Sequence, residues 1–113
     1  MDAGQYNIVT KQGSTFELPF TIDDDGTPWN IVGWTARMQV RPFIESSTVL
    51  LSLANGSGIT LAAGGSVTVN ITGAQLSALP AGTHVYDLEL VDLTGKPWSV
   101  LEGKFLVKPE TTR

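Results

Sequence analysis

The chain has 113 residues, of which 42% are hydrophobic and 16% are charged, and its formal net charge is −4. This length fits a single core, so we expect residues 1–113 to form one domain. The acidic balance argues against a main role in gripping nucleic acid phosphates or an anionic membrane surface, since both need concentrated positive charge. The absence of cysteine excludes disulfides, thiolate metal sites and a cysteine nucleophile.

The N-terminal residues lack the basic and apolar regions of a secretory signal. No apolar run approaches the roughly 20 residues that a helix needs to cross a bilayer. We therefore expect a soluble protein that is made in the cytoplasm of its cell.

Apolar residues recur with a period of two along most of the chain, which predicts strands with one buried face. A first short strand is expected around residues 6–10. The strand predicted over residues 15–22 contains Pro19, which cannot donate a ladder hydrogen bond, so this strand should lie at a sheet edge or contain a bulge. The residues expected to point inward are Phe16, Leu18, Phe20, Ile22, Trp34, Ala36, Met38, Val40, Val49, Leu51, Leu53, Val67, Val69, Ile71, Tyr86, Leu88, Leu90, Leu101, Gly103, Phe105 and Val107.

One segment, residues 72–79, has a helical pattern. Thr72 and Gln75 have the spacing of a capping box, and Pro80 ends the segment. Turn signals rich in Gly, Pro, Asn and Asp separate the predicted strands. The sequence therefore predicts an all-β fold, an immunoglobulin-like antiparallel β-sandwich of about seven or eight strands with one short helical turn.

Two segments of the chain, Ile22–Ile31 and Val91–Val100, share one pattern. Each reads apolar, Asp, two variable residues, Gly, one variable residue, Pro, Trp, polar and β-branched. We interpret them as two hairpin tips with the same turn chemistry, in which Gly takes a positive φ and Trp starts the return strand. One repeated pair is too few for a solenoid.

Catalytic chemistry is hard to assemble from this sequence. His84 is the only histidine, and we expect it to be a solvated residue at a strand end. No nucleophile elbow accompanies it. Asp87 and Glu89 are expected on the outer face of a strand, away from a cleft, so an acid pair for hydrolysis is disfavoured. We expect no enzymatic activity and no cofactor.

The best metal candidate is the run Asp23-Asp24-Asp25-Gly26, because calcium favours clustered carboxylates on a glycine-containing turn. Trp34, however, stands where a calcium loop places its closing glutamate. A plain acidic turn is preferred, with calcium left open as the alternative, and no metal ligand is assigned.

Charged residues on the predicted strands suggest a ladder. If the third strand neighbours the sixth, Arg37 and Arg41 lie opposite Asp87 and Glu89, with Lys104 flanking the acids from the seventh strand. A subunit contact through the same arginines is the alternative.

Trp29 and Trp98 begin the return strands of the two predicted tips. Each is either a lid that folds over the open end of the sandwich or an exposed anchor for a partner protein or a sugar. Trp34, on the inward phase of its strand, is expected in the core. The candidate partner-interface residues are Pro28, Trp29, Asn30, Pro97 and Trp98.

The sequence also resembles a recurring bacteriophage module. The resemblance is carried by FELPFTI at 16–22, an acidic turn with Gly26-Thr27-Pro28, NIVGWTA at 30–36, LPAGT at 79–83, YDLEL at 86–90 and LEGKFLV at 101–107. It is similar to small virion proteins of tailed phages and to the N-terminal immunoglobulin-like domain of upper baseplate proteins. With a single predicted domain, residues 1–113 are not expected to include the receptor-binding domain of those baseplate proteins.

This resemblance implies a non-enzymatic structural protein of the virion, made in the cytoplasm of the host bacterium. Such a protein is expected to act as an adaptor in the tail or baseplate, docking onto other virion proteins in multiple symmetric copies, without binding nucleic acid or a membrane. Capsid decoration is the alternative within this class. A carbohydrate-binding module is a further alternative, and it requires two coplanar exposed indoles at Trp29 and Trp98.

Overall fold

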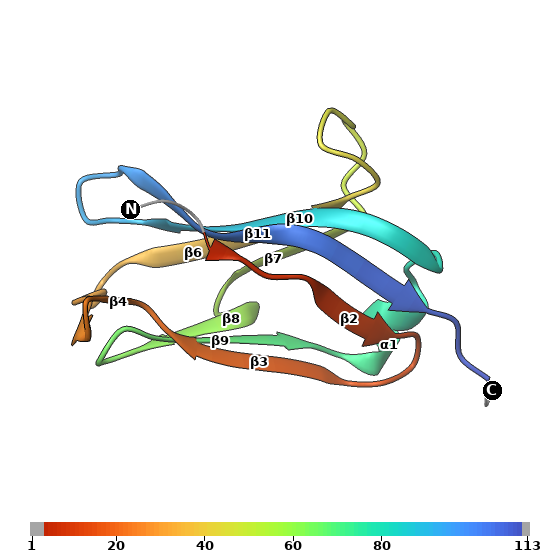
Figure 1. The fold of residues 1–113 in the computed structure, drawn as a ribbon, viewed down its shortest axis with the longest axis horizontal. Helices are drawn as coiled ribbons and strands as arrows, with labels where there is room; N and C mark the ends of the chain where they lie inside the picture. Colours follow the sequence, from red (N-terminus) through yellow and green to blue (C-terminus); the bar gives the residue numbers. More distant parts are fainter. Residues whose placement is uncertain (1–3, 112–113) are drawn as a thin grey trace.

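The fold is an all-β sandwich, seen in a computed structural model that describes residues 4–111 (Figure 1). Within these residues the chain forms eleven short strands and one helical turn. In chain order they are β1 (Gly4–Gln5), β2 (Ile8–Lys11), β3 (Phe16–Thr21), β4 (Asp23–Asp24), β5 (Thr27–Pro28), β6 (Thr35–Arg41), β7 (Leu51–Asn55), β8 (Gly58–Ala62), β9 (Ser66–Ile71), α1 (Gly73–Ser77), β10 (Gly82–Val91) and β11 (Pro97–Lys108).

Two layers face each other across the core. One contains β11, β10, β6 and β7, with β1 and β2 along its outer edge, and the other contains β8, β9 and β3 (Figure 1). Hydrogen bonds join them into one curled sheet, because β7 and β8 still pair through Ala54 with Gly58 and Asn55 with Ile59. The order β11-β10-β6-β7 opposite β8-β9-β3 is that of an immunoglobulin-like sandwich. The predicted fold class is therefore confirmed.

Not every pairing is antiparallel. β1 and β2 both run parallel to β11, at the edge where the first and last strands of the fold meet. The tip strands β4 and β5 form a separate two-stranded sheet. The strand count exceeds the predicted seven or eight partly because the first strand is split in two and the tip contributes two more.

The core follows the period-two pattern. Inward residues of β6, β9 and β10 are almost completely shielded from solvent, among them Met38, Val69 and Leu88. Burial of such side chains contributes roughly 1.5–3 kcal/mol each. Phe105 and Val107 of β11 are buried as predicted, whereas the predicted inward residue Val49 precedes β7 and is exposed.

The prediction for Pro19 is confirmed. β3 stands at one end of the strand order and pairs only with β9, where Pro19 lies opposite Thr68. The missing N–H of proline is tolerated there because one side of an edge strand has no ladder to complete.

The predicted capping box is also present. The Thr72 hydroxyl accepts a hydrogen bond from the Gln75 backbone N–H at 3.1 Å, and the Gln75 side-chain oxygen accepts one from the Thr72 N–H at 2.9 Å. The helix is a single turn with Leu76 buried beneath it. No helix within residues 4–111 is long and apolar enough to cross a membrane.

Two features of the sheet were not predicted. β8 was missed, although Ile59 is fully buried, because glycines at positions 56 and 58 read only as a turn. A register shift beside Leu88 and Glu89 leaves Val100 of β11 without a direct partner on β10, and its side chain turns inward. Such a bulge changes which residues stand opposite each other along the rest of the ladder.

Candidate functional site

The two segments with the repeated pattern form hairpin tips at the same end of the sandwich (Figure 1). Trp29 follows the first tip and Trp98 follows the second, and their ring centroids are 5.5 Å apart. The interpretation of the repeat as two tips is confirmed, and the fold brings them into contact.

The first tip is a tight two-residue turn. Asp24 pairs with Thr27 across it, and the central residues Asp25 and Gly26 both have positive φ, 48° and 86°. This is the type I′ geometry that Asp-Gly favours in hairpins. Gly65 of the β8–β9 connection lies against the base of the tip, since its carbonyl accepts the Ile22 N–H at 2.9 Å.

The second tip is held by one carboxylate. Asp92 accepts hydrogen bonds from the Thr94 N–H and the Lys96 N–H at 2.9 Å each, and from the Thr94 hydroxyl at 2.6 Å. The Trp98 indole N–H donates to its other oxygen at 3.1 Å. The Thr94 hydroxyl, the Trp98 indole and the Lys96 N–H together hold the pKa of Asp92 well below its usual range.

Three tryptophans form a cluster under the tips. Trp29 meets both Trp34 and Trp98 edge to face, at centroid distances of 5.8 and 5.5 Å and interplanar angles of 66° and 82°. All three are half-buried and pack against the core. Trp29 and Trp98 thus act as lids that keep part of their surface exposed, and Trp34 is less buried than its strand phase predicted because it precedes β6.

The indole N–H groups are fixed by the tips. The Trp29 N–H donates to Asp24 at 3.2 Å, as the Trp98 N–H does to Asp92. The Lys96 ammonium lies 4.5 Å from the centroid of the Trp98 ring, a cation–π distance. The cluster therefore has two anchored rings at right angles, not the coplanar pair that a sugar-stacking platform requires.

Exposed apolar side chains border the cluster, and the sequence reading missed them. Val32 is 66% exposed and Leu93 is 74% exposed. Leu93 lies against Gly33, the residue after Val32, because a Cβ on Gly33 would stand 2.9 Å from a Leu93 methyl group. The signal was present as apolar residues inside two turn segments. We call Trp29, Trp34, Trp98, Val32 and Leu93 the tryptophan end.

A hollow of about 430 Å³ lies beside the tryptophan end, between the segment that leads into β6 and the end of β8. Val32, Trp34 and Leu61 line it. The remaining candidate interface residues, Pro28, Asn30 and Pro97, are exposed on or next to the same tips. All five residues selected from the sequence are therefore gathered at one end, and whether they contact a partner stays a prediction.

The acidic residues at the first tip have structural roles in the turn. Asp24 accepts the Trp29 indole hydrogen bond, and Asp25 forms the left-handed corner of the turn. Within residues 4–111 no three acidic or histidine side chains are grouped so that they could hold a metal ion.

The expectation of a solvated His84 is wrong. The side chain is only 8% exposed, near the opposite end of the sandwich, and its Nε2 lies 2.8 Å from the Pro80 carbonyl oxygen. His84 pairs with Phe105 across the ladder and shares its inward phase. Because Pro80 bends the chain back over this strand end, the ring is covered, and its polar atom is satisfied by the backbone.

The predicted charge ladder holds at one rung. Arg37 lies opposite Glu89, and its Nε is 2.8 Å from Glu89 Oε1. Arg41 instead lies opposite Val85 and donates to Gln39 and to the Ser46 carbonyl, at 2.8 and 2.6 Å. Pairing of Arg41 with an acid was therefore wrong.

The third part of that ladder differs as well. Lys104 lies opposite Val85, and the residue opposite Asp87 on β11 is Glu102. Two carboxylates thus face each other across the sheet. Burial, Glu89 and Glu102 together raise the pKa of Asp87, and the nearby arginines only partly offset them.

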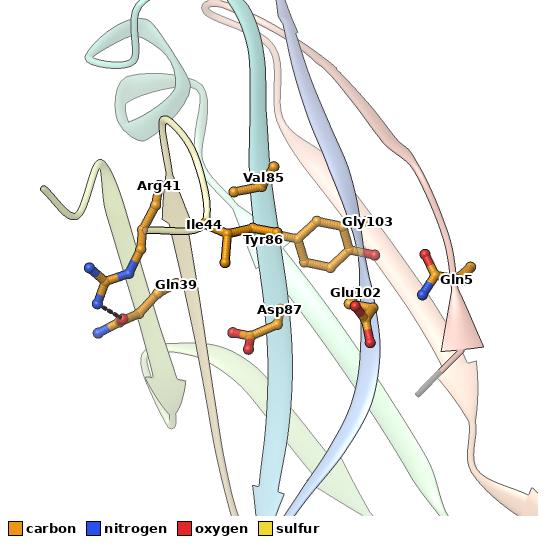
Figure 2. Close-up of a pocket in the computed structure, with 9 residues that line it drawn as sticks. All are labelled: Gln5, Gln39, Arg41, Ile44, Val85, Tyr86, Asp87, Glu102 and Gly103. Carbon is orange, nitrogen blue, oxygen red and sulfur yellow. Dashed lines mark hydrogen bonds between the residues drawn. The ribbon is translucent and has the colours of Figure 1, made fainter. Parts of the chain in front are cut away.

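This part of the sheet is hollowed. A depression of about 340 Å³ lies over β6, β10 and β11, with Asp87 and Glu102 on its floor and Ile44 of the β6–β7 connection at its side (Figure 2). Tyr86 crosses beneath it, and its hydroxyl donates to the Tyr6 carbonyl at 2.6 Å. Burial together with Tyr6 and Glu102 raises the pKa of Tyr86 to about 12, so the hydroxyl remains a donor at neutral pH.

Comparison with known proteins adds no relative. No protein-family model matches the chain, and no curated protein matches it either.

Proposed function

We propose that this protein is a structural component of a tailed-bacteriophage virion, a non-enzymatic adaptor in the tail or baseplate that docks onto other virion proteins. The proposal draws on the resemblance of the strand and turn segments to phage virion modules, together with the sandwich fold. In this proposal the chain is made in the bacterial cytoplasm and works in the virion in several symmetric copies, where many weak contacts act together.

The observation that carries the docking role is the tryptophan end. Val32 and Leu93 expose most of their apolar surface beside rings that are held in place by Asp24 and Asp92. Rigid apolar and aromatic groups lose little conformational freedom on binding, which makes them effective interface anchors. The partner in this proposal is a virion protein that presents an apolar side chain to the hollow beside Trp34.

The ring geometry disfavours the carbohydrate alternative, because the planes of Trp29 and Trp98 differ by 82°. One sugar ring cannot lie flat on both. Capsid decoration is the competing position within the virion, and imaging of labelled particles separates the head from the tail.

The test uses the exposed border residues, since they can be changed without removing core contacts. Leu93→Glu and Val32→Glu place a charge in the proposed contact, and purified phage particles are then assayed for the protein. We expect on the order of a tenfold loss from particles, with the melting temperature of the free protein nearly unchanged.

Phe43→Glu is the matched control, because Phe43 is 57% exposed on the β6–β7 connection, away from the tips. Equal loss from all three variants would contradict docking by the tryptophan end. The virion proposal itself would be overturned by two results together: the wild-type particle contains none of the protein, and particles assemble and infect normally without its gene. Imaging of particles in which this protein is labelled shows whether it lies in the tail or in the head.

A further inference from the structure

The outer face of the sheet formed by β6, β10 and β11 has no second layer over it within residues 4–111, and the β6–β7 connection projects from it at one place (Figure 1). Its charged side chains stand in successive rows across the strands. One row holds Asp87 and Glu102, and the next holds Arg41, Val85 and Lys104. Negative and positive rows therefore lie side by side on one face.

Within residues 4–111 no cation forms an ion pair with the negative row, and Arg37 and Arg41 act on Asp87 only from a distance. Among the described residues, the single ion pair within 4.0 Å joins Arg37 to Glu89, one row further along. Arg41 is turned to Gln39 and Ser46. Like charges directly opposite in a sheet are destabilising, so Asp87 and Glu102 would gain from a cation supplied from outside.

The same strand carries the matching cation. Glu102 and Lys104 are two residues apart on β11, so both side chains point to this face, and both are exposed. Consider a two-fold axis that lies above this face, parallel to the sheet and perpendicular to β11, level with the midpoint between these two residues. The rotation places residue 102 of one copy over residue 104 of the other. Glu102 of each copy then meets Lys104 of the other, which makes the face complementary to itself.

We propose that this face binds the same face of a second copy of the chain, with Lys104 of each copy entering the depression of the other between Glu102 and Asp87. The depression of about 340 Å³ has room for a lysine side chain (Figure 2). Ile44 and Val85 line it and contact the apolar stem, while the carboxylates bind the ammonium. Arg41 also lines the depression, with its guanidinium held by Gln39 and the Ser46 carbonyl. The dimer is weak and sensitive to salt, because its specific contacts are charged and open to water.

This inference deepens the proposed function, since it assigns a surface to the symmetric copies. It is tested separately, on the purified full chain in solution, by sedimentation velocity over a range of concentrations at low and high salt. We expect a monomer–dimer equilibrium that shifts toward monomer as salt rises. A monomer at every soluble concentration in low salt would overturn the proposal.

The two-fold arrangement makes a specific prediction for charge exchange. Glu102→Lys alone and Lys104→Glu alone each place like charges together and should weaken the dimer about tenfold or more. The double exchange, Glu102→Lys with Lys104→Glu, should restore it. An equimolar mixture of the two single variants should form a mixed dimer, because one chain is then basic at both positions and the other acidic.

Glu17→Lys is the matched control, as Glu17 is exposed on β3 in the opposite layer and the charge change equals that of Glu102→Lys. Melting temperatures of all variants check that each one is folded. A dimer that persists in both single variants, or no recovery in the double variant and the mixture, would refute this pairing. Loss of the dimer with normal incorporation into particles would leave docking by the tryptophan end standing.

Discussion

The two hairpin tips begin from nearly the same sequence pattern and close in different ways. In the first tip Asp24 pairs with Thr27, so the turn contains two residues. In the second, the Asp92 N–H donates to the Lys96 carbonyl at 3.0 Å, so the loop contains the three residues from Leu93 to Gly95. By alignment Asp92 corresponds to Asp23, and the two tips differ in register by one residue.

One position explains the difference. The type I′ turn needs positive φ at both central residues, and Asp25 accepts it at 48° next to Gly26. The corresponding residue in the second tip is Thr94, whose branched Cβ disfavours that region. Only Gly95 is left-handed there, at 87°, so the turn widens by one residue. The Asp92 carboxylate then binds the N–H groups that the wider loop leaves open.

The register difference changes which aspartate each tryptophan binds. Trp29 bonds the aspartate five residues before it, and Trp98 bonds the one six residues before it. The Trp98 bond is partly buried and belongs to a carboxylate with three other donors, while the Trp29 bond is exposed. The second tip is therefore the more firmly tied of the two.

The largest effect should come from removing the rings. Trp98→Ala is expected to lower the free energy of unfolding by about 2–4 kcal/mol, toward the lower end for a large aromatic because part of its surface is already exposed. Trp29→Ala should cost less, since it loses a weaker indole hydrogen bond. Chemical denaturation measures both, with Leu93→Ala as a control that should change little. Equal losses for the two tryptophans would contradict the difference between the tips.

The next effect should come from Asp92, and it depends on pH. Hydrogen bonds hold the pKa of this carboxyl below that of an unfolded aspartate, near 3.9, so its contribution is complete above that value and is lost as pH falls. Asp92→Asn should lower the melting temperature at pH 7 and reduce the loss of stability on acidification. Melting curves between about pH 2 and pH 7 test this.

Asp87, whose pKa is raised, should affect the pH dependence of stability in the opposite direction to Asp92. Protonation of this group favours the folded state, so its unfavourable contribution falls away as pH drops through its folded pKa. Asp87→Asn should therefore stabilise the protein slightly at pH 7. It should also make the melting temperature fall more steeply as the pH is lowered. A loss of stability at neutral pH would show that the like-charge pairing with Glu102 is not the controlling interaction.

The effect confined to the tips themselves should come from exchanging the turn residues. Asp25→Thr forces a branched side chain into positive φ and should cost about 1–2 kcal/mol. Thr94→Asp creates an Asp-Gly pair in the second tip, but it removes the hydroxyl that donates to Asp92 and places a second carboxylate beside it, so it should also destabilise the protein. Nuclear magnetic resonance of the backbone distinguishes the two turn types. If Asp25→Thr is neutral, the choice of residue does not determine the register.

Local patterns in the sequence predicted the parts of the fold that depend on local chemistry. Alternation identified most of the inward residues, Pro19 identified an edge strand, and Thr72 with Gln75 identified the helix start. Long-range register was beyond reach, because the bulge at Val100 and the loop lengths decide which residues face each other. For that reason Arg41 and Lys104 were paired wrongly with the acids, and Glu102 was not recognised as the residue opposite Asp87.

The location of the site was predictable from the sequence, but the contacts within it were not. The repeated Gly-x-Pro-Trp pattern located both tips, and their contact required the fold. His84 was misplaced since its burial depends on Pro80 folding back over the strand end. Val32 and Leu93 were overlooked because apolar residues in turns carry no periodic signal.

Pro19 also bears on how tightly many copies can be crowded. A strand with an uninterrupted row of donors invites a neighbouring molecule to extend the sheet, and repetition of that event yields fibrils. β3 has a gap in its row of donors at Pro19, midway along its six residues. High local concentrations can therefore bring these molecules close together without joining them edge to edge.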